Sequence, residues 1–443
     1  MTNTNIVFRS AIVAALGGFL FGFDTAVISG VEKSIQQLWT LDSFNHGFTI
    51  ASALIGTVIG SLIAGILSEK FGRKRVLQAI GLLYLVTSIV TALTSSWEIF
   101  VMFRFLGGVG VGASSVVGPM YISEISPAAN RGKLVGLFQF NVVCGILIAF
   151  VSNYLLFDVS EESWRWMLGV QAFPSLVFFV MVFFVPESPR WLIKQKRIDE
   201  AQKVFSQVGE PNPKEAIRII EESLHSEVGA KKENVFNGNY NKPVMFAMIL
   251  AMFNQFSGIN AIMYYAPRIF EMTGLAKDTA LLQAISIGLT NMIFTLIGIS
   301  IIDKVGRKKL LLVGSVGMVI SLGLVARAFY LDQKGGYDVM LYLVGFIAFF
   351  AFSQGAVIWV FIAEIFPNKV RSAGQSLGSS THWILAAAIS WTFPIIAGME
   401  DGGYYSFLFF AIMMFVQGFF VWKVLPETKG KSLEGIQQSL GIH

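Results

Sequence analysis

The sequence predicts an all-α membrane protein: twelve transmembrane helices in two pseudo-symmetric six-helix bundles, joined by a cytoplasmic helical linker. Three observations lead to this fold class. The 443 residues are 54% hydrophobic and only 14% charged, whereas about a quarter of the residues in a soluble domain are charged. Twelve apolar stretches each approach the roughly 20 helical residues that cross a bilayer. Polar motifs at the ends of these stretches occur twice, in the same order.

Each apolar stretch is predicted to be a helix, because a segment in lipid has to pair its backbone groups internally. The composition disfavours the alternative, a soluble all-helical protein with buried helices. The predicted spans are 8–31, 48–68, 76–95, 98–122, 133–157, 165–185, 243–271, 279–302, 309–331, 338–363, 372–397 and 403–424.

Basic residues gather in alternate loops, such as Lys70–Arg75 and Lys304–Lys309, while acidic residues predominate in the loops between them. An excess of Lys and Arg marks the cytoplasmic side of a membrane protein. We therefore expect a multi-pass protein of the cytoplasmic membrane with both termini in the cytoplasm. The net charge of +5 then reflects topology, and no nucleic-acid partner is expected.

The centre of the chain is polar and contains no spanning stretch. Arg197–Val208 and Asn212–Leu224 carry apolar residues at three- and four-residue spacing, which is typical of amphipathic surface helices. The expected organisation is a six-helix bundle over 1–186, a cytoplasmic linker over 187–242, a second six-helix bundle over 243–425 and a tail over 426–443.

The polar motifs indicate an internal duplication. EISPAANR begins at Glu124 and EIFPNKVR at Glu364, 240 residues later. SEKFGRKR from Ser68 returns as IDKVGRKK from Ile302, and the Pro-Glu pair at Pro186 returns at Pro426. Each copy follows the equivalent span of its half, so the repeating unit has six helices.

The repeated charges are predicted to form a cytoplasmic gate, in which ion pairs hold the two halves together. Partly exposed ion pairs contribute little each and can break and form again. The alternative is that these charges only set the topology. The predicted gate residues are Glu69, Arg73, Glu124, Arg131, Asp303, Arg307, Glu364 and Arg371.

Neutral amides and large aromatic side chains within the spans suit a sugar. Each sugar hydroxyl both donates and accepts a hydrogen bond, as an amide does, and an indole can cover the apolar face of the ring. The alternative for any one amide is a hydrogen bond to a neighbouring helix. The candidates are Gln139, Gln255, Asn260, Asn291, Tyr264, Trp359 and Trp383.

Two ionisable residues lie well inside predicted spans, Asp24 in the first and Arg104 in the fourth. Charges in the hydrocarbon region are costly and are interpreted by default as functional. If Arg104 approaches and leaves during the transport cycle, Asp24 would release and take up a proton in turn. The alternative is a static pair that only stabilises the bundle.

An ordered set of motifs resembles the sugar porter family of the major facilitator superfamily. The set covers nearly the whole chain and consists of FLFGFDTAVISG (Phe19–Gly30), PMYISEISP (Pro119–Pro127), PESPRWL (Pro186–Leu192), NQFSGINAIMYYAP (Asn254–Pro267), AEIFP (Ala363–Pro367), SWTFP (Ser390–Pro394) and PETKGKSLE (Pro426–Glu434).

The resemblance implies the major facilitator fold and import of monosaccharides by alternating access. It implies that Asp24, beside Arg104, is the proton-coupling position, which passive facilitators fill with a neutral residue. It also implies sugar contacts at Gln139, Gln255, Asn260, Asn291, Gly355 and Trp359.

Three positions depart from the family pattern. Asn254 stands where the family usually has Gln, so a direct sugar contact there could become water-mediated. Ala356 stands where a proline usually follows Gly355, which puts the usual helix break in doubt. His382 stands beside Trp383 where the family has Gln or Asn. We include Asn254 and His382 among the candidate sugar-binding residues.

The sequence thus predicts a proton-coupled importer of a pentose or hexose. A passive uniporter on the same scaffold is the first alternative, and a transporter-like sugar sensor the second. No phosphate-binding loop, metal cluster or nucleophile motif is found in the sequence, so neither an enzyme nor a cofactor other than the coupling proton is expected. We expect a functional monomer whose partners are a small neutral sugar and the lipid bilayer.

Overall fold

The computed structural model describes the chain except for residues 1–2, 128–129, 230–233, 334–336, 368 and 431–443. The described residues are mostly helical, and none of them lies in a strand. Among them, twelve helical segments are long and apolar enough to cross a membrane. The twelve predicted spans are therefore confirmed.

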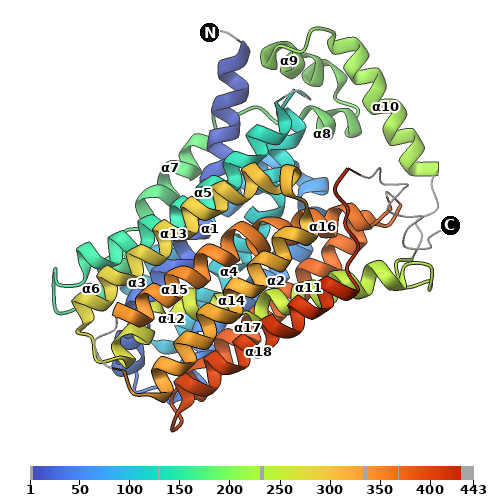
Figure 1. The fold of residues 1–443 in the computed structure, drawn as a ribbon. Helices are drawn as coiled ribbons and strands as arrows, with labels where there is room; N and C mark the ends of the chain where they lie inside the picture. Colours follow the sequence, from blue (N-terminus) through green and yellow to red (C-terminus); the bar gives the residue numbers. More distant parts are fainter. Residues whose placement is uncertain (1–2, 128–129, 230–233, 334–336, 368, 431–443) are drawn as a thin grey trace. The chain divides into compact units, whose positions relative to one another are not determined.

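The first repeat supplies the first six spans, and short helices follow it (Figure 1). The sixth span is divided into two helices, α6 and α7. The helices are α1 (Asn3–Leu38), α2 (Ser43–Phe71), α3 (Arg73–Leu93), α4 (Trp97–Ile125), α5 (Arg131–Leu156), α6 (Ser163–Gly169), α7 (Ala172–Val182), α8 (Pro189–Lys194), α9 (Ile198–Val208) and α10 (Pro213–Gly229).

The second repeat supplies the other six spans. The seventh span is divided into α11 and α12, and the tenth contains a π-helical turn, η1. The elements are α11 (Asn241–Phe256), α12 (Ile259–Met272), α13 (Lys277–Val305), α14 (Arg307–Tyr330), α15 (Tyr337–Phe350), η1 (Ala351–Gly355), α16 (Ala356–Ile365), α17 (Arg371–Ala397) and α18 (Gly402–Lys423).

The chain forms two compact units. The first contains residues Met1–Thr25, Ile55–Ala149 and Arg165–Lys231, and the second contains Ala26–Leu54, Phe150–Trp164 and Lys232–His443. Parts of α1, α2 and α5 thus cluster with the second repeat, although the sequence places these helices in the first. The domain boundaries predicted from the sequence separate the two repeats. Whether they also separate two folding units stays a prediction.

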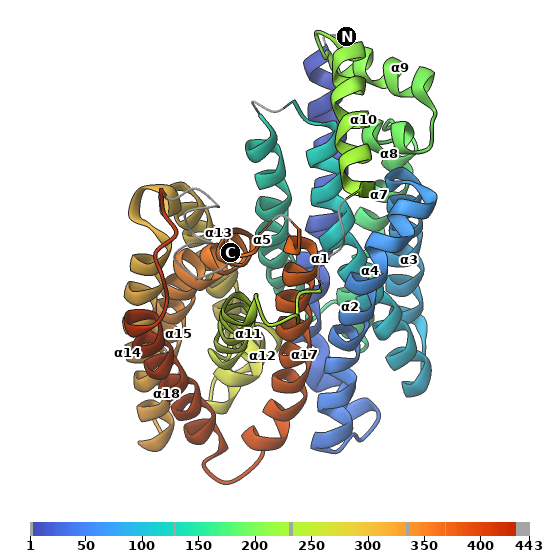
Figure 2. The same ribbon diagram turned by 90° about the vertical axis from the view of Figure 1, so that its right-hand side faces the viewer.

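Within the first unit, α3 packs against α4 and α7. The linker helices α8, α9 and α10 lie near the first turns of α1 (Figures 1 and 2). As predicted, α9 is amphipathic, and its buried side consists of Ala201, Val204, Phe205 and Val208. Helix α8 was not predicted. It begins where the Ser188 hydroxyl accepts a hydrogen bond from the Trp191 N–H, with Pro189 in the first turn, a favourable helix start.

Within the second unit, α14 packs against both α15 and α18, and α11 packs against α17 (Figure 2). A buried apolar cluster here brings Phe361 and Phe366 together with Leu250 and Leu311. These contacts hold the loop ends of α13, α14 and α16 close together. The repeated polar motifs lie at those ends.

Candidate functional site

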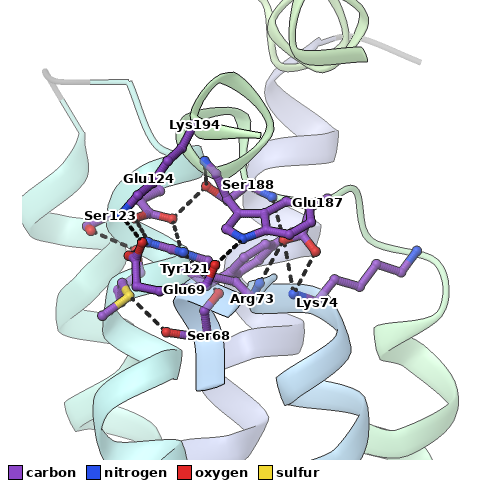
Figure 3. Close-up of polar contacts among 12 residues, drawn as sticks. Ser68, Glu69, Arg73, Lys74, Tyr121, Ser123, Glu124, Glu187, Ser188 and Lys194 are labelled. Carbon is purple, nitrogen blue, oxygen red and sulfur yellow. Dashed lines mark hydrogen bonds and ion pairs between the residues drawn. The ribbon is translucent and has the colours of Figure 1, made fainter. Parts of the chain in front are cut away.

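The repeated motif of the first unit closes around Arg73 (Figure 3). Its guanidinium donates two hydrogen bonds to Glu124, at 2.8 and 2.9 Å, and one to Glu69 at 2.7 Å. The hydroxyl of Ser188 donates to Glu124 at 2.6 Å. Arg73 is only 3% exposed and Glu124 is half-buried. The two bonds make the pair fork-shaped, the strong geometry for arginine and carboxylate. We call Glu69, Arg73, Glu124, Glu187 and Ser188 the first loop cluster.

Glu187 caps the start of α3. Its carboxylate accepts the backbone N–H groups of Arg73 at 3.0 Å and Lys74 at 3.1 Å, donors that a helix start leaves without intrahelical partners. Burial raises the pKa of Glu187, while these backbone donors act in the opposite direction. Gly72 permits the close approach, because its φ is +94° and a Cβ there would lie 2.3 Å from the carboxylate. This explains the glycine of the Gly-Arg-Lys motif.

The second unit repeats this geometry. Arg307 donates to Glu364 at 2.7 Å and pairs with Asp303 at 3.0 Å. Glu427 accepts the N–H groups of Arg307 and Lys308 at the start of α14. Gly306 has a φ of +101° and faces the Glu427 carboxylate. Thr428 donates to Glu364 at 2.6 Å, as Ser188 does to Glu124. We call Asp303, Arg307, Glu364, Glu427 and Thr428 the second loop cluster.

The two loop clusters bear on the gate prediction. Every ion pair named in them joins residues of one unit, whereas the sequence predicted pairs that hold the two halves together. The prediction that ion pairs hold the two halves together therefore stays untested. Arg371 donates to the backbone oxygen of Phe366, and Arg131 is exposed at the start of α5. Glu187, Ser188, Glu427 and Thr428 were missed as members, although their Pro-Glu-Ser and Pro-Glu-Thr repeats were visible in the sequence.

Asp24 and Arg104 meet inside the first unit, as predicted. Nη1 of Arg104 donates to Oδ1 of Asp24 at 2.9 Å, and the two residues are 3% and 7% exposed. Nε and Nη2 of Arg104 are buried without a hydrogen-bond partner in the described chain. The pair thus has one strong bond and two unsatisfied donors.

In the second unit, predicted sugar-binding amides converge on Gln255. Nε2 of Gln255 donates to Asn254 at 2.9 Å and lies 3.1 Å from a ring nitrogen of His382. Oε1 of Gln255 accepts from Asn260 at 2.7 Å. We call Asn254, Gln255, Asn260 and His382 the amide cluster. Three of its members are buried and Asn260 is half-buried.

Two irregular helices position these groups. Gly258, with a φ of +82°, separates α11 from α12, so Gln255 and Asn260 lie on either side of a left-handed residue. The tenth span contains η1 directly before Ala356. The absence of proline at position 356 had put a helix break in doubt, but the π-helical turn provides an irregularity there. Single π-helical turns often occur at functional sites.

Aromatic rings adjoin the amide cluster. The ring of His382 lies 4.9 Å from that of Trp359 and 4.8 Å from that of Trp383. Trp359 is 40% exposed, which leaves part of the indole able to cover an apolar ring face. The remaining candidates lie on several elements: Tyr264 and Asn291 are buried on α12 and α13, Gly355 ends η1, and Gln139 is exposed on α5 of the first unit.

Sequence reasoning missed one further buried group. Glu32 of α1 bonds with Arg268 of α12 and His46 of α2. An acid at the end of the first span was a signal for it. The partners were not visible, because Arg268 lies 236 residues away. We call Glu32, His46 and Arg268 the Glu32 cluster.

Comparison with known proteins decides the family. The family model "Sugar (and other) transporter" matches residues 10–440. The chain belongs to this sugar transporter family. It is 37% identical over 432 residues to the arabinose-proton symporter of Bacillus subtilis, covering 96% of this chain and 93% of that protein. It is 34% identical over 476 residues to the D-xylose-proton symporter of Escherichia coli K12, covering 98% and 96%.

A solved structure supports the same assignment. The inward-open conformation of the xylose transporter XylE from E. coli matches with a TM-score of 0.87 at 33% identity, covering 98% of this chain and 99% of that one. The sugar transporter described here therefore has the major facilitator fold, as the resemblance implied. It is a multi-pass membrane protein and a transporter rather than an enzyme.

Proposed function

We propose that this sugar transporter imports a neutral monosaccharide, a pentose or a hexose, together with a proton. Two relatives that it matches over more than nine-tenths of its length are named as proton symporters for arabinose and xylose. The amide cluster and Trp359 are the proposed sugar contacts, with Gln139, Asn291, Tyr264, Gly355 and Trp383. The proton is the coupling ion, and alternating access is the mechanism.

The buried pair of Asp24 and Arg104 carries the proposal. A pair kept only for stability needs its remaining polar groups satisfied, because a buried charge is costly to leave unpaired. Arg104 instead has two buried donors without a partner in the described chain. An arginine held by one bond can part from its acid more easily than one held by several. This favours a pair that breaks during transport over a static one.

The proton acts at the carboxylate of Asp24. When Asp24 is charged, its Oδ1 accepts the hydrogen bond from Arg104 and the two side chains attract each other. When a proton binds there, the attraction between opposite charges disappears and the helices α1 and α4 lose this bond. A symporter has to prevent reorientation of the loaded carrier without its proton. A carboxyl group whose charge decides a helix contact can impose that rule.

Asp24→Asn tests the proposal, because asparagine has nearly the same shape and is permanently neutral. We expect the variant to bind sugar and to exchange it by counterflow. We expect it to lose accumulation of sugar against a gradient. Both activities are measured in one preparation of proteoliposomes with an imposed pH gradient. Asp278→Asn, an exposed acid at the start of α13, is the matched control and should accumulate sugar normally.

The outcome separates symport from uniport. A passive uniporter would show no accumulation even in the unaltered protein, and Asp24→Asn would then change little. Accumulation by Asp24→Asn at the unaltered level would place the proton elsewhere. Competition with a panel of pentoses and hexoses in the same vesicles identifies the sugar.

The proposed topology has both termini and both loop clusters on the cytoplasmic side of the cell membrane. Its support is the excess of Lys and Arg in the loops that carry those clusters. This topology accounts for the positive net charge, so no nucleic-acid partner is proposed. We further propose that the transporter works as a monomer.

A further inference from the structure

The Glu32 cluster ties three helices together within the second unit. Nε of Arg268 donates to Oε1 of Glu32 at 2.8 Å, and its Nη2 lies 2.7 Å from Oε2. The same Nη2 donates to Gln36 at 2.5 Å. Nε2 of His46 lies 2.7 Å from Oε2 of Glu32. Glu32 and Gln36 belong to α1, His46 to α2 and Arg268 to α12.

The cluster is closed to solvent at its centre and open at one side. Glu32 is 1% exposed and His46 is fully buried. The side chain of Arg268 is 19% exposed, and it borders a pocket of about 340 Å³ that Lys33, Gln36, Gln37 and Glu271 also line. The second ring nitrogen of His46 has no hydrogen-bond partner in the described chain. Solvent therefore reaches the ion pair at one edge, and its hydrogen bonding is incomplete.

The cluster lies at the end of α2 opposite to the first loop cluster. His46 is in the first turn of α2, whereas Glu69 is in the last. Two further contacts occur at this end. Lys33 pairs with Glu271, and the indole N–H of Trp391 in α17 donates to the backbone oxygen of Phe44 at 3.1 Å. Contacts between α1 or α2 of the first repeat and α12 or α17 of the second are thus concentrated here.

We propose that Glu32, His46 and Arg268 form a latch that holds the outer side of the transporter closed and has to open before sugar can enter from that side. The latch rests on the proposed function, because alternating access requires that these helices part on the outer side. Two features suit it to this task. The buried Glu32, held by Arg268 and by the buried His46, stabilises the closed state. The partly exposed edge at Arg268 gives water a place to enter.

Labelling of a single cysteine tests the latch. Thr49 lies one turn deeper than His46 on the same face of α2 and is fully buried. Thr49→Cys is introduced after Cys144→Ser removes the only native cysteine. A membrane-impermeant maleimide is then added to vesicles of each orientation without sugar or a gradient. We expect slow labelling with the latch intact, and labelling at least about tenfold faster in Glu32→Gln and Arg268→Gln. Arg268→Gln strands the buried charge of Glu32, and Glu32→Gln removes the acid that ties Arg268 to α1.

A charge swap separates the latch from a general loss of structure. The double variant Glu32→Arg with Arg268→Glu restores the opposite charges and should bring labelling back to within about threefold of the starting rate. Lys33→Gln is the matched control. It breaks the neighbouring pair, in which the Lys33 side chain is half exposed, and exposed pairs contribute little. Its labelling rate should stay close to the starting rate.

The outcomes are distinct from those of the Asp24 test. Unchanged labelling in both Glu32→Gln and Arg268→Gln overturns the latch, and so does equal acceleration by Lys33→Gln. Where Glu32→Gln yields no folded protein, Arg268→Lys keeps the charge and loses the forked geometry; faster labelling there supports the latch, and an unchanged rate overturns it. Because the assay needs neither sugar nor protons, a failed symport proposal leaves this result intact.

Discussion

At the scale of single residues, Gln255 occupies the centre of the proposed sugar site. It donates to Asn254, accepts from Asn260 and lies within bonding distance of His382. Gln255→Ala removes all three contacts together. A net hydrogen bond is worth about 0.5–1.5 kcal/mol, and stranding a buried group costs more. We therefore expect the variant to bind sugar about tenfold more weakly or worse, measured by equilibrium binding in detergent.

Gln354→Ala is the matched control for Gln255→Ala. Gln354 is also a buried amide of the second unit, and it donates to Gln417. It belongs to no proposed sugar contact. Its loss should lower the melting temperature while leaving sugar affinity within about twofold. Equal losses of affinity in the two variants would mean that the amides serve helix packing, the alternative that the sequence left open.

Part of the site could be predicted from the chemistry of single residues. Contacts between residues far apart in the sequence could not. Asp24 and Arg104 stood out because charges inside apolar spans need a partner, and the structure pairs them. Glu32 and Arg268 were missed, since one lies at the end of a span and nothing in the pattern links it to a base 236 residues away. Whether Arg73 pairs within its own half could not be read from the sequence, because charges alone do not specify distances.

At the scale of elements, the break between α11 and α12 depends on Gly258. A left-handed backbone costs a residue with a Cβ roughly 1–2 kcal/mol, and a Cβ at Gly258 would lie 2.4 Å from the ring of Phe410. Gly258→Ala should therefore destabilise the second unit by about 2 kcal/mol or more. Thermal unfolding in detergent measures this. Adding Phe410→Leu should recover only the part of the lost stability that comes from the clash with the Phe410 ring, and not the backbone cost.

Gly65→Ala provides the control for that substitution. Gly65 lies within α2, and nothing comes within 4 Å of a Cβ built there. Alanine is the better helix former, so the melting temperature should stay the same or rise. A neutral Gly258→Ala would show that the break tolerates a side chain and that its glycine has another role.

The elements themselves were largely predictable, but their irregularities were not. Apolar stretches of spanning length gave all twelve spans, because a segment in lipid has few alternatives to a helix. The helix ends extended past the apolar stretches, as in α1, which continues to Leu38. The π-helical turn at Ala351–Gly355 had no sequence signal that we used.

At the scale of the whole molecule, the duplication predicts that equivalent substitutions in the two repeats cost similar free energies of unfolding. Glu124 and Glu364 each accept from a buried arginine and from a hydroxyl. Each substitution takes from a buried arginine its less exposed carboxylate partner, although Glu69 or Asp303 remains. Stranding a buried charge completely costs about 3–5 kcal/mol, so Glu124→Ala and Glu364→Ala should each lower stability by a similar amount below that limit. Thermal unfolding of the two purified variants makes the comparison.

The same variants test whether the loop clusters also hold the halves together. If they do, a cysteine engineered beside the amide cluster should become more accessible from the cytoplasmic side in Glu364→Ala. Unchanged accessibility combined with lower stability would limit both clusters to structural roles within their own units. If either substitution left stability unaltered, the ion pair that it removes would not stabilise its unit.

The positions of the loop clusters in the chain also set an order of assembly during synthesis. The first cluster needs nothing beyond Ser188, so it can form while the ribosome is still making the linker. The second needs Glu427 and Thr428, which cap α14 and bind Glu364, and these are made 240 residues after Glu187 and Ser188. The second loop cluster can therefore form only after the chain has been made through Thr428. A chain that ends after residue 425 should be degraded faster in pulse-chase experiments than one that ends after residue 430, and equal lifetimes would contradict this order.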